Sequence, residues 1–84
     1  MQYGIYSIRD KHTGFMAPMI DMTDESAQRN FSLTVNSNPG VIGFKPEDFD
    51  LYKIGDFDID SGIINPMIPP KFICNGFEVK KHDS

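Results

Sequence analysis

The sequence predicts an α+β domain in which an antiparallel sheet of about four strands carries one helix packed on a face. Three observations support this fold class. Residues 3–10 and 51–57 are rich in aromatic and β-branched side chains, as strands are. Residues 24–37 have apolar side chains at helical spacing. Glycine, proline and aspartate mark turns between these segments, which gives two hairpins in ββ-α-ββ order.

The first predicted hairpin precedes the helix. Residues 3–10 form its first strand, and the sequence KHTG at 11–14 forms its turn. A second, short strand follows at 15–20. Pro18 has no N–H to donate to a ladder, so this strand is expected at an edge of the sheet, or broken.

The helix is predicted over residues 24–37. Thr23 is a good N-cap, and Asp24 and Glu25 in the first turn complement the helix dipole. The sequence Asn-Pro-Gly at 38–40 ends the helix. One face carries an apolar stripe, which consists of Ala27, Phe31, Thr34 and Val35.

The second hairpin is predicted after the helix. Residues 41–44 (VIGF) fit either a short strand or a packed loop, and residues 45–50 form a turn around a proline. A strand over 51–57 follows, and its return begins at 62–65. The alternative architecture is a small open β-barrel that carries a helix in one connection.

The last third of the chain is rich in proline. The stretch 65–70 is expected to lie extended across the surface, and residues 71–79 to add a last edge strand with a tight turn at Asn75-Gly76. A tail at about 80–84 is expected to fray. With 84 residues, the chain 1–84 is expected to form one domain.

A short motif, Tyr-x-Ile-x-Asp, occurs at 6–10 and again at 52–56. Each copy is followed by a small hydroxyl residue and a glycine, at 13–14 and at 61–62. Both endings suit a hairpin with a type I turn and a glycine in the left-handed conformation. We therefore expect the same local chemistry to build both hairpins.

The second of these turns resembles the start of a calcium loop, because Asp56, Asp58 and Asp60 alternate. A helix-loop-helix calcium loop also needs a glycine and a bidentate glutamate at set positions. The corresponding residues here are Ser61 and Met67, and no helix is predicted before the loop. We expect a solvated acidic turn and no metal site.

No residue pattern points to catalysis. His12 and His82 have no second ligand at metal spacing, and no sequence signal places a histidine to activate Cys74. The lone cysteine excludes an internal disulfide. We expect neither an enzyme nor a bound cofactor.

The composition is that of a soluble globular protein, with 39% hydrophobic and 24% charged residues. No apolar run is long enough to span a membrane, and the first residues lack the layout of a signal peptide, so a cytoplasmic protein is expected. The net charge of −4 argues against a general nucleic-acid binder. The acidity is local, however, because residues 47–60 contain six acids and one base.

The period of two in strands sorts the side chains of the two Tyr-x-Ile strands onto two faces. The face toward the helix is predicted to carry Tyr6, Ile8, Tyr52 and Ile54. The other face is predicted to carry Tyr3, Ile5, Ser7, Arg9, Leu51 and Lys53. That second face mixes aromatic, apolar and basic groups, as a single-strand-binding surface does. Tyr3, Arg9 and Lys53 are therefore candidate nucleic-acid contacts; the alternative is an ordinary half-solvated sheet face or a dimer interface.

Two further surfaces are candidates for protein contacts. Leu33 falls opposite the apolar stripe of the predicted helix. The acidic region 47–60, with Asp56, Asp58 and Asp60, suits a basic partner and can mimic DNA. The small size of the chain and the edge strand at 15–20 favour a symmetric homodimer.

The order of several segments resembles the small nonstructural protein of gokushoviruses, which are tailless single-stranded-DNA phages of the Microviridae. The segments are YGIYSIRDKHTGFMAP, then DESAQRNF, then PEDFDLYKIGDFDIDSG with prolines following. The resemblance covers about residues 3–70 and leaves 71–84 unmatched. It implies a phage protein made in the cytoplasm of the host bacterium and not needed in the capsid shell. It carries over no catalytic or binding residue.

Two functions from different classes follow. The family that the chain resembles is suspected of a role in genome replication, or in the switch to single-strand synthesis and packaging. The protein is then a replication accessory protein that binds single-stranded DNA weakly. The alternative is an adaptor that engages the phage initiator or a host replication factor through residues 47–60, without contact to DNA.

Overall fold

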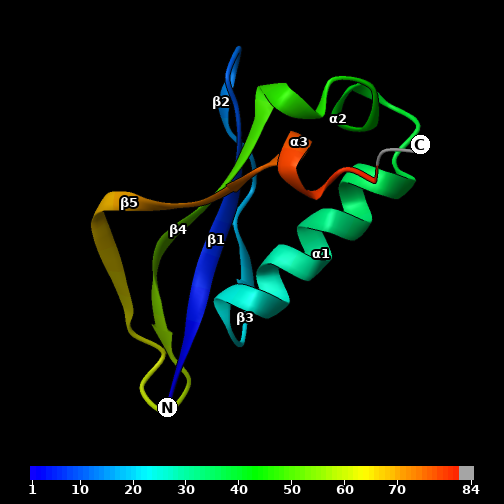
Figure 1. The fold of residues 1–84 in the computed structure, drawn as a ribbon. Helices are drawn as coiled ribbons and strands as arrows, with labels where there is room; N and C mark the ends of the chain where they lie inside the picture. Colours follow the sequence, from blue (N-terminus) through cyan, green and yellow to red (C-terminus); the bar gives the residue numbers. More distant parts are fainter. Residues whose placement is uncertain (82–84) are drawn as a thin grey trace.

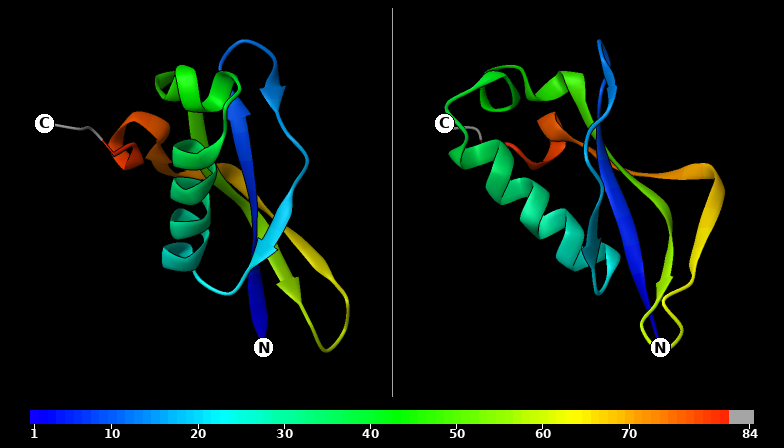
Figure 2. Two further views of the ribbon diagram at one scale, coloured as in Figure 1. Left: turned by 90° about the vertical axis from the view of Figure 1, so that its right-hand side faces the viewer. Right: turned by 180° about the vertical axis from the view of Figure 1, so that it is seen from behind.

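Five antiparallel strands form one curled sheet, and the α-helices all lie on one side of it (Figures 1 and 2). The computed structural model describes residues 1–81. The strands are β1 (Gln2–Asp10), β2 (Gly14–Phe15), β3 (Met19–Asp21), β4 (Phe49–Asp58) and β5 (Ile64–Asn75). The helices are α1 (Asp24–Ser37), α2 (Val41–Phe44), the 3-10 turn η1 (Pro46–Asp48) and α3 (Gly76–Val79). The predicted α+β class and the ββ-α-ββ order are confirmed.

Strands β1 and β4 pair at the centre of the sheet. β5 lies on the outer side of β4, and both β2 and β3 pair with the outer side of β1. The predicted edge strand at 15–20 is broken around Pro18, which separates β2 from β3. Both turn glycines have the predicted positive φ, 106° at Gly14 and 76° at Gly62.

Helix α1 spans the predicted range and begins at the predicted cap. The hydroxyl oxygen of Thr23 accepts a hydrogen bond of 3.0 Å from the backbone N–H of Ser26, which satisfies one of the free donors of the first turn. The buried face of α1 consists of Ala27, Phe31 and Val35. These side chains pack on a core contributed by the sheet and α2, made of Tyr6, Ile8, Ile42, Phe49, Leu51 and Cys74.

The side chains of β4 are reversed relative to the prediction. Leu51 is fully buried in the core and lies opposite Ile8 of β1, whereas Tyr52 lies opposite Ser7. Residues directly opposite each other in an antiparallel pair project to the same face. The prediction that Tyr52 faces the helix, and that Leu51 faces away, is therefore wrong.

A bulge at Ile54 interrupts the alternation of β4 beyond Lys53. Ile5 pairs with Gly55 and Tyr6 pairs with Lys53, so Ile54 is an extra residue in β4. A bulge adds one residue to one strand and changes the register beyond it. The local signal for it is Gly55, because a glycine inside a strand often marks a bulge or a close backbone approach.

Two predicted extended segments are single helical turns. In α2, the backbone N–H of Lys45 donates to the carbonyl of Val41 at 2.7 Å, so residues 41–44 are neither strand nor loop. In α3, Asn75 is the N-cap: its side-chain oxygen accepts from the N–H of Phe77, and Glu78 accepts from the N–H of Asn75. This capping box replaces the tight turn expected at Asn75-Gly76.

The proline-rich stretch 65–70 lies within β5 and is largely exposed. Pairing with β4 is interrupted there, because Lys71 pairs with Lys53 and the next pair joins Pro66 to Gly55. β5 turns a corner at this interruption and projects to the side of the sheet away from the helices (Figures 1 and 2). The Ile68-Pro69 peptide bond is cis.

The chain after α3 returns to helices α1 and α2. The backbone N–H of Lys81 donates to the side chain of Asn36 at 2.7 Å, and the ammonium group of Lys80 donates to the carbonyl of Gly43 at 3.2 Å. These two residues of the segment expected to fray are therefore hydrogen-bonded. Residues 82–84, including His82, lie outside the described part of the chain.

Candidate functional site

The face of the sheet away from α1, here called the open face, carries most of the aromatic side chains that the core leaves out. Cross-strand pairing assigns its residues, because partners share a face. They are Tyr3, Ile5, Ser7 and Arg9 of β1, with Phe15, Tyr52, Phe57 and Phe72 on the neighbouring strands. The α-helices lie on the opposite side (Figure 2).

Three rings of the open face form a row across β2, β4 and β5, here called the aromatic row. Phe15 and Tyr52 have ring centroids 5.5 Å apart, and Tyr52 and Phe72 have centroids 5.7 Å apart, both in edge-to-face geometry. Such pairs hold aromatic rings in fixed orientations. Phe15 and Phe72 are each 50% exposed, so both outer rings offer apolar surface to solvent.

A small buried residue, Ser7, lies beneath the aromatic row. Ser7, the partner of Tyr52 on β1, is fully buried, and its hydroxyl donates to the carbonyl of Met16 at 2.7 Å. This bond ties the segment between β2 and β3 to β1. The row is therefore built on paired backbone and not on a mobile loop.

Arg9 lies beside the aromatic row, opposite Phe15 on β2 and opposite Asp50 on β4. Asp50 is buried and already accepts a 2.7 Å hydrogen bond from the side-chain amide of Asn75. Within residues 1–81, no salt bridge joins Arg9 to a carboxylate. Its half-buried guanidinium group is thus a cation that the fold leaves without an acidic partner.

The three predicted nucleic-acid contacts are not brought together. Tyr3 shares the open face with Arg9 but lies six residues along β1, which corresponds to ~20 Å of strand. Lys53 is on the helix-covered face, opposite Tyr6, and its ammonium group is 3.2 Å from a carboxylate oxygen of Asp56. Its side chain is only 20% exposed. Lys53 is therefore paired within the fold and points away from the open face.

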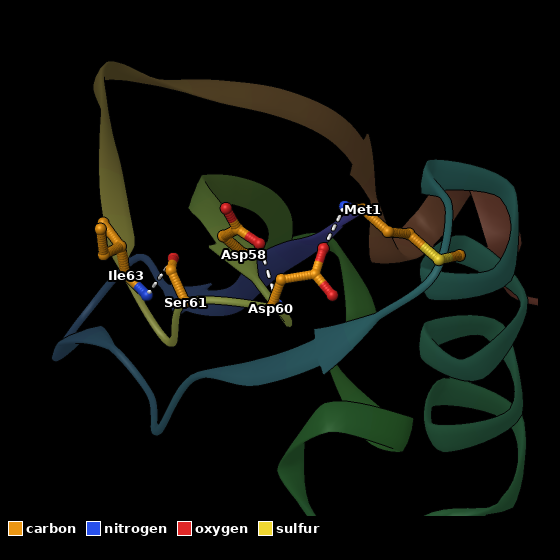
Figure 3. A network of polar contacts seen from close by, with 5 residues as sticks. All are labelled: Met1, Asp58, Asp60, Ser61 and Ile63. Atoms are coloured by element: carbon orange, nitrogen blue, oxygen red, sulfur yellow. Dashed lines mark hydrogen bonds and ion pairs between the residues drawn. The ribbon is translucent and has the colours of Figure 1, made fainter.

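The acidic hairpin tip between β4 and β5 uses its carboxylates to hold the turn and the first residue (Figure 3). Asp58 accepts a hydrogen bond from the N–H of Asp60 at 2.9 Å, and this bond lowers the pKa of Asp58 more than any other contact. Asp60 forms a 3.1 Å ion pair with the amino group of Met1. Asp56 is instead paired with Lys53. Among residues 1–81, no group of three acidic, histidine or cysteine side chains is placed to hold a metal ion.

The other residues singled out from the sequence, Cys74, His12 and Leu33, lie in different parts of the fold. Burial raises the pKa of the Cys74 thiol to about 11, so the sulfur is protonated at neutral pH. His12 is exposed and lies 3.3 Å from Asp48. Leu33 is 62% exposed on α1, opposite the buried stripe.

A polar cluster ties the start of α1 to the sheet. The Tyr6 hydroxyl donates to Asp24 at 2.5 Å, and the ammonium group of Lys71 donates to the other oxygen of Asp24 at 2.9 Å. These two contacts lower the pKa of Asp24, whereas burial and the bond to Asp24 raise the pKa of Tyr6. The cluster thus joins the first turn of α1 to both β1 and β5.

Sequence reasoning missed the aromatic row as a unit. Phe15 and Phe72 lie in segments predicted as strands, but only the strand order and the register place them on either side of Tyr52. The only local signal is the composition, with seven Phe and three Tyr in 84 residues. That count predicts aromatic surface without predicting its position.

No helix within residues 1–81 is both long and apolar enough to cross a membrane.

Comparison with known proteins gives one match. No curated protein and no solved structure matches the chain. The model of the family described as Phage ORF5 protein matches residues 3–79, from the start of β1 to the end of α3. The chain therefore belongs to the phage ORF5 protein family.

Proposed function

We propose that this phage protein, in the manner of the gokushovirus proteins it resembles, is an accessory factor in genome replication or in the switch to single-strand synthesis and packaging. It acts in the cytoplasm of the host bacterium by binding single-stranded DNA weakly through the open face. The observation that carries the proposal is the aromatic row with Arg9 beside it. The family assignment supports the phage setting.

The binding mode follows from the exposed groups. Unpaired bases stack on aromatic side chains without regard to sequence, and Phe15 and Phe72 are the half-exposed rings available for this. Arg9 has no acidic partner in the described fold and neutralises a phosphate. Tyr3 extends the surface toward the far end of β1. Lys53 plays no part in this mode because Asp56 already pairs with it.

The affinity is expected to be low. The formal net charge is −4, and Arg9 is the cation that strand pairing places beside the aromatic row. Each phosphate contact contributes about −0.7 to the slope of log K against log salt for single strands. We expect a slope corresponding to one or two contacts and a dissociation constant in the micromolar range or weaker.

Fluorescence anisotropy with a labelled single-stranded oligonucleotide tests the proposal, at about 20 mM salt where electrostatic attraction is little screened. Phe72→Ala should weaken binding by about 1–3 kcal/mol, the usual contribution of one stacked base. Arg9→Gln should flatten the salt dependence. Lys53→Gln is the matched control, because it removes the same charge from the covered face and should leave the salt dependence unchanged. Absence of binding, or equal effects of the two charge variants, would remove the proposal.

The second candidate is the adaptor that binds a replication protein, and the composition of the acidic hairpin tip favours it. Exposed isoleucines flank the carboxylates there, since Ile59 is 41% and Ile63 is 57% exposed. Apolar side chains surrounded by carboxylates form a surface that can bind a protein partner whose contact surface has an apolar centre and a basic rim. Leu33 is a further contact in this reading.

Affinity capture from infected cells, with and without nuclease, separates the two functions. A protein partner that survives nuclease and is lost in Ile59→Ser with Asp60→Asn supports the adaptor. The paired control is Phe72→Ala, which should leave that partner bound. Partners that disappear after nuclease treatment support the DNA-binding function instead.

A further inference from the structure

A small apolar cavity opens between β3 and α1, at the edge of the sheet formed by the first hairpin. Its volume is about 250 Å³. It is lined by Tyr6, Met19, Ile20, Asp21, Ala27 and Asn30. Sites for small-molecule ligands usually occupy ~300–1,000 Å³, so this cavity is better matched to a single apolar side chain. The amide of Asn30 donates to Asp21 at 2.7 Å, so these two polar residues of the lining are paired with each other.

A protruding side chain lies next to the cavity on the same edge. Met22 directly follows β3 and is 61% exposed, although its backbone is fixed by a 2.8 Å hydrogen bond from its N–H to Asp21. Methionine is unbranched and adapts to irregular apolar spaces. The same edge exposes Met16, Met19 and Ile20 at 49%, 39% and 50%.

We propose that two copies of the chain associate through this edge, with Met22 of each copy inserted into the cavity between β3 and α1 of the other. A two-fold axis requires one surface to carry both complementary features. The Met22 side chain and the adjacent cavity meet that requirement on one chain. β3 also pairs with no strand other than β1 in the described fold, so its outer side is open to a partner.

The exposed apolar side chains of the edge can form the centre of a small interface. Met16, Met19, Ile20 and Met22 are between 39% and 61% exposed. A standard interface takes ~800 Å² from each partner, a little more than half of it apolar. The edge therefore supplies the apolar part of a stable but modest dimer. Ile20 pairs with Ile5 and so lies on the open face at this edge, whereas Tyr52 and Phe72 of the aromatic row lie on β4 and β5, beyond β1. The dimer leaves these two rings accessible, so this inference does not depend on DNA binding.

Sedimentation velocity over about 1–100 μM protein tests the inference, a range that brackets the dissociation constants of modest interfaces. The wild-type chain should shift from monomer to dimer within this range. Met22→Asp should raise the dissociation constant at least tenfold. Ile68→Asp is the matched control, since Ile68 is 86% exposed on β5 and far from the proposed interface. It should leave the dimer intact.

A second variant tests the cavity itself. Ala27→Met fills the cavity from α1 and should also produce a monomer, with helical circular dichroism retained. A wild-type monomer throughout the range would overturn the inference. Dimerisation that survives Met22→Asp but is lost in Ile68→Asp would also overturn it, because the interface would then lie on β5. If Ala27→Met fails to fold, the comparison of Met22→Asp with Ile68→Asp still decides the matter.

Discussion

The two hairpins begin with the same motif, Tyr-x-Ile-x-Asp, yet their tyrosines lie on opposite faces of the sheet. Tyr6 is 1% exposed beneath α1 and donates a hydrogen bond to Asp24. Tyr52 lies on the open face between the rings of Phe15 and Phe72. The same motif has thus produced a core residue in one hairpin and a surface residue in the other.

The difference arises from what precedes each tyrosine. β4 enters the sheet with Phe49 and Leu51 in the core, and because side chains alternate along a strand, Tyr52 must project to the other face. The turn chemistry is shared, since Gly14 and Gly62 both have positive φ. A local motif therefore determines the strand and its turn, whereas the pairing register between β1 and β4 determines the face.

Replacing each of the two tyrosines with alanine should give the largest difference in stability between the two hairpins. Tyr6→Ala should lose about 3–5 kcal/mol of unfolding free energy, as truncations of buried aromatic residues do, and leave little folded protein in a domain of this size. Tyr52→Ala loses two edge-to-face contacts and should cost about 1–2 kcal/mol. Urea unfolding followed by circular dichroism measures both. Equal costs would mean that the two faces are packed alike, and the comparison would fail.

Replacing each tyrosine with phenylalanine removes only the hydroxyl group and tests the difference between the two positions more specifically. Tyr6→Phe should cost about 1.5–3 kcal/mol at neutral pH, because it breaks a hydrogen bond to a charged partner. Tyr52→Phe should change stability by less than about 0.5 kcal/mol. The pKa of Asp24 is lowered from 3.8 in the fold. Its stabilising contribution is therefore complete above that value and is lost as the pH falls through the lower folded value.

The cost of Tyr6→Phe should accordingly shrink in acid. Urea titrations at about pH 7 and about pH 3 give the two values to compare, since Asp24 begins to bind its proton in the unfolded chain near the lower pH. A cost that stays constant between the two conditions would show that the carboxylate of Asp24 is not the acceptor that matters. Tyr52→Phe, measured at both pH values, is the control.

The smallest expected effect concerns the turns. Asp58→Asn keeps an oxygen to accept the N–H of Asp60 and should leave the melting temperature nearly unchanged. Millimolar calcium should move the melting temperature of the wild-type chain by no more than about one degree, because a ligand that binds only the folded state must stabilise it. A rise of several degrees, abolished by Asp58→Asn, would reveal a metal site in the second turn that the first turn lacks.

Elements specified by local chemistry could be predicted from the sequence. Thr23 and the apolar stripe predicted α1 at its observed bounds, and Pro18 predicted the break between β2 and β3. The single turn α2 could not be predicted, because tertiary contacts select it. The sequence did carry a local signal for α3, since Asn75 and Glu78 form a capping box. The packing of α3 could not be predicted: a Cβ atom at Gly76 would collide with the carbonyl oxygen of Pro46, a residue distant in sequence.

The candidate site was predicted only in part, and the reason is register. Arg9 and Tyr3 were assigned to the correct face because β1 alternates without interruption. Lys53 was assigned to the wrong face because the alternation of β4 starts from Phe49, and Ile54 interrupts the ladder further along. The aromatic row combines side chains from β2, β4 and β5, so its existence depends on strand order, which no single segment encodes.

The prolines of β5 have a consequence for how far the protein can assemble. β5 is the outer strand of the sheet on its side, and Pro66, Pro69 and Pro70 have no N–H to offer an added strand. If both edge strands of a sheet could pair with another molecule, copies could add to each other indefinitely and form fibres. With the β5 edge blocked, strand pairing at the opposite edge of the sheet could join two copies but could not continue beyond them. The prolines of β5 thus limit edge-to-edge pairing to a closed pair.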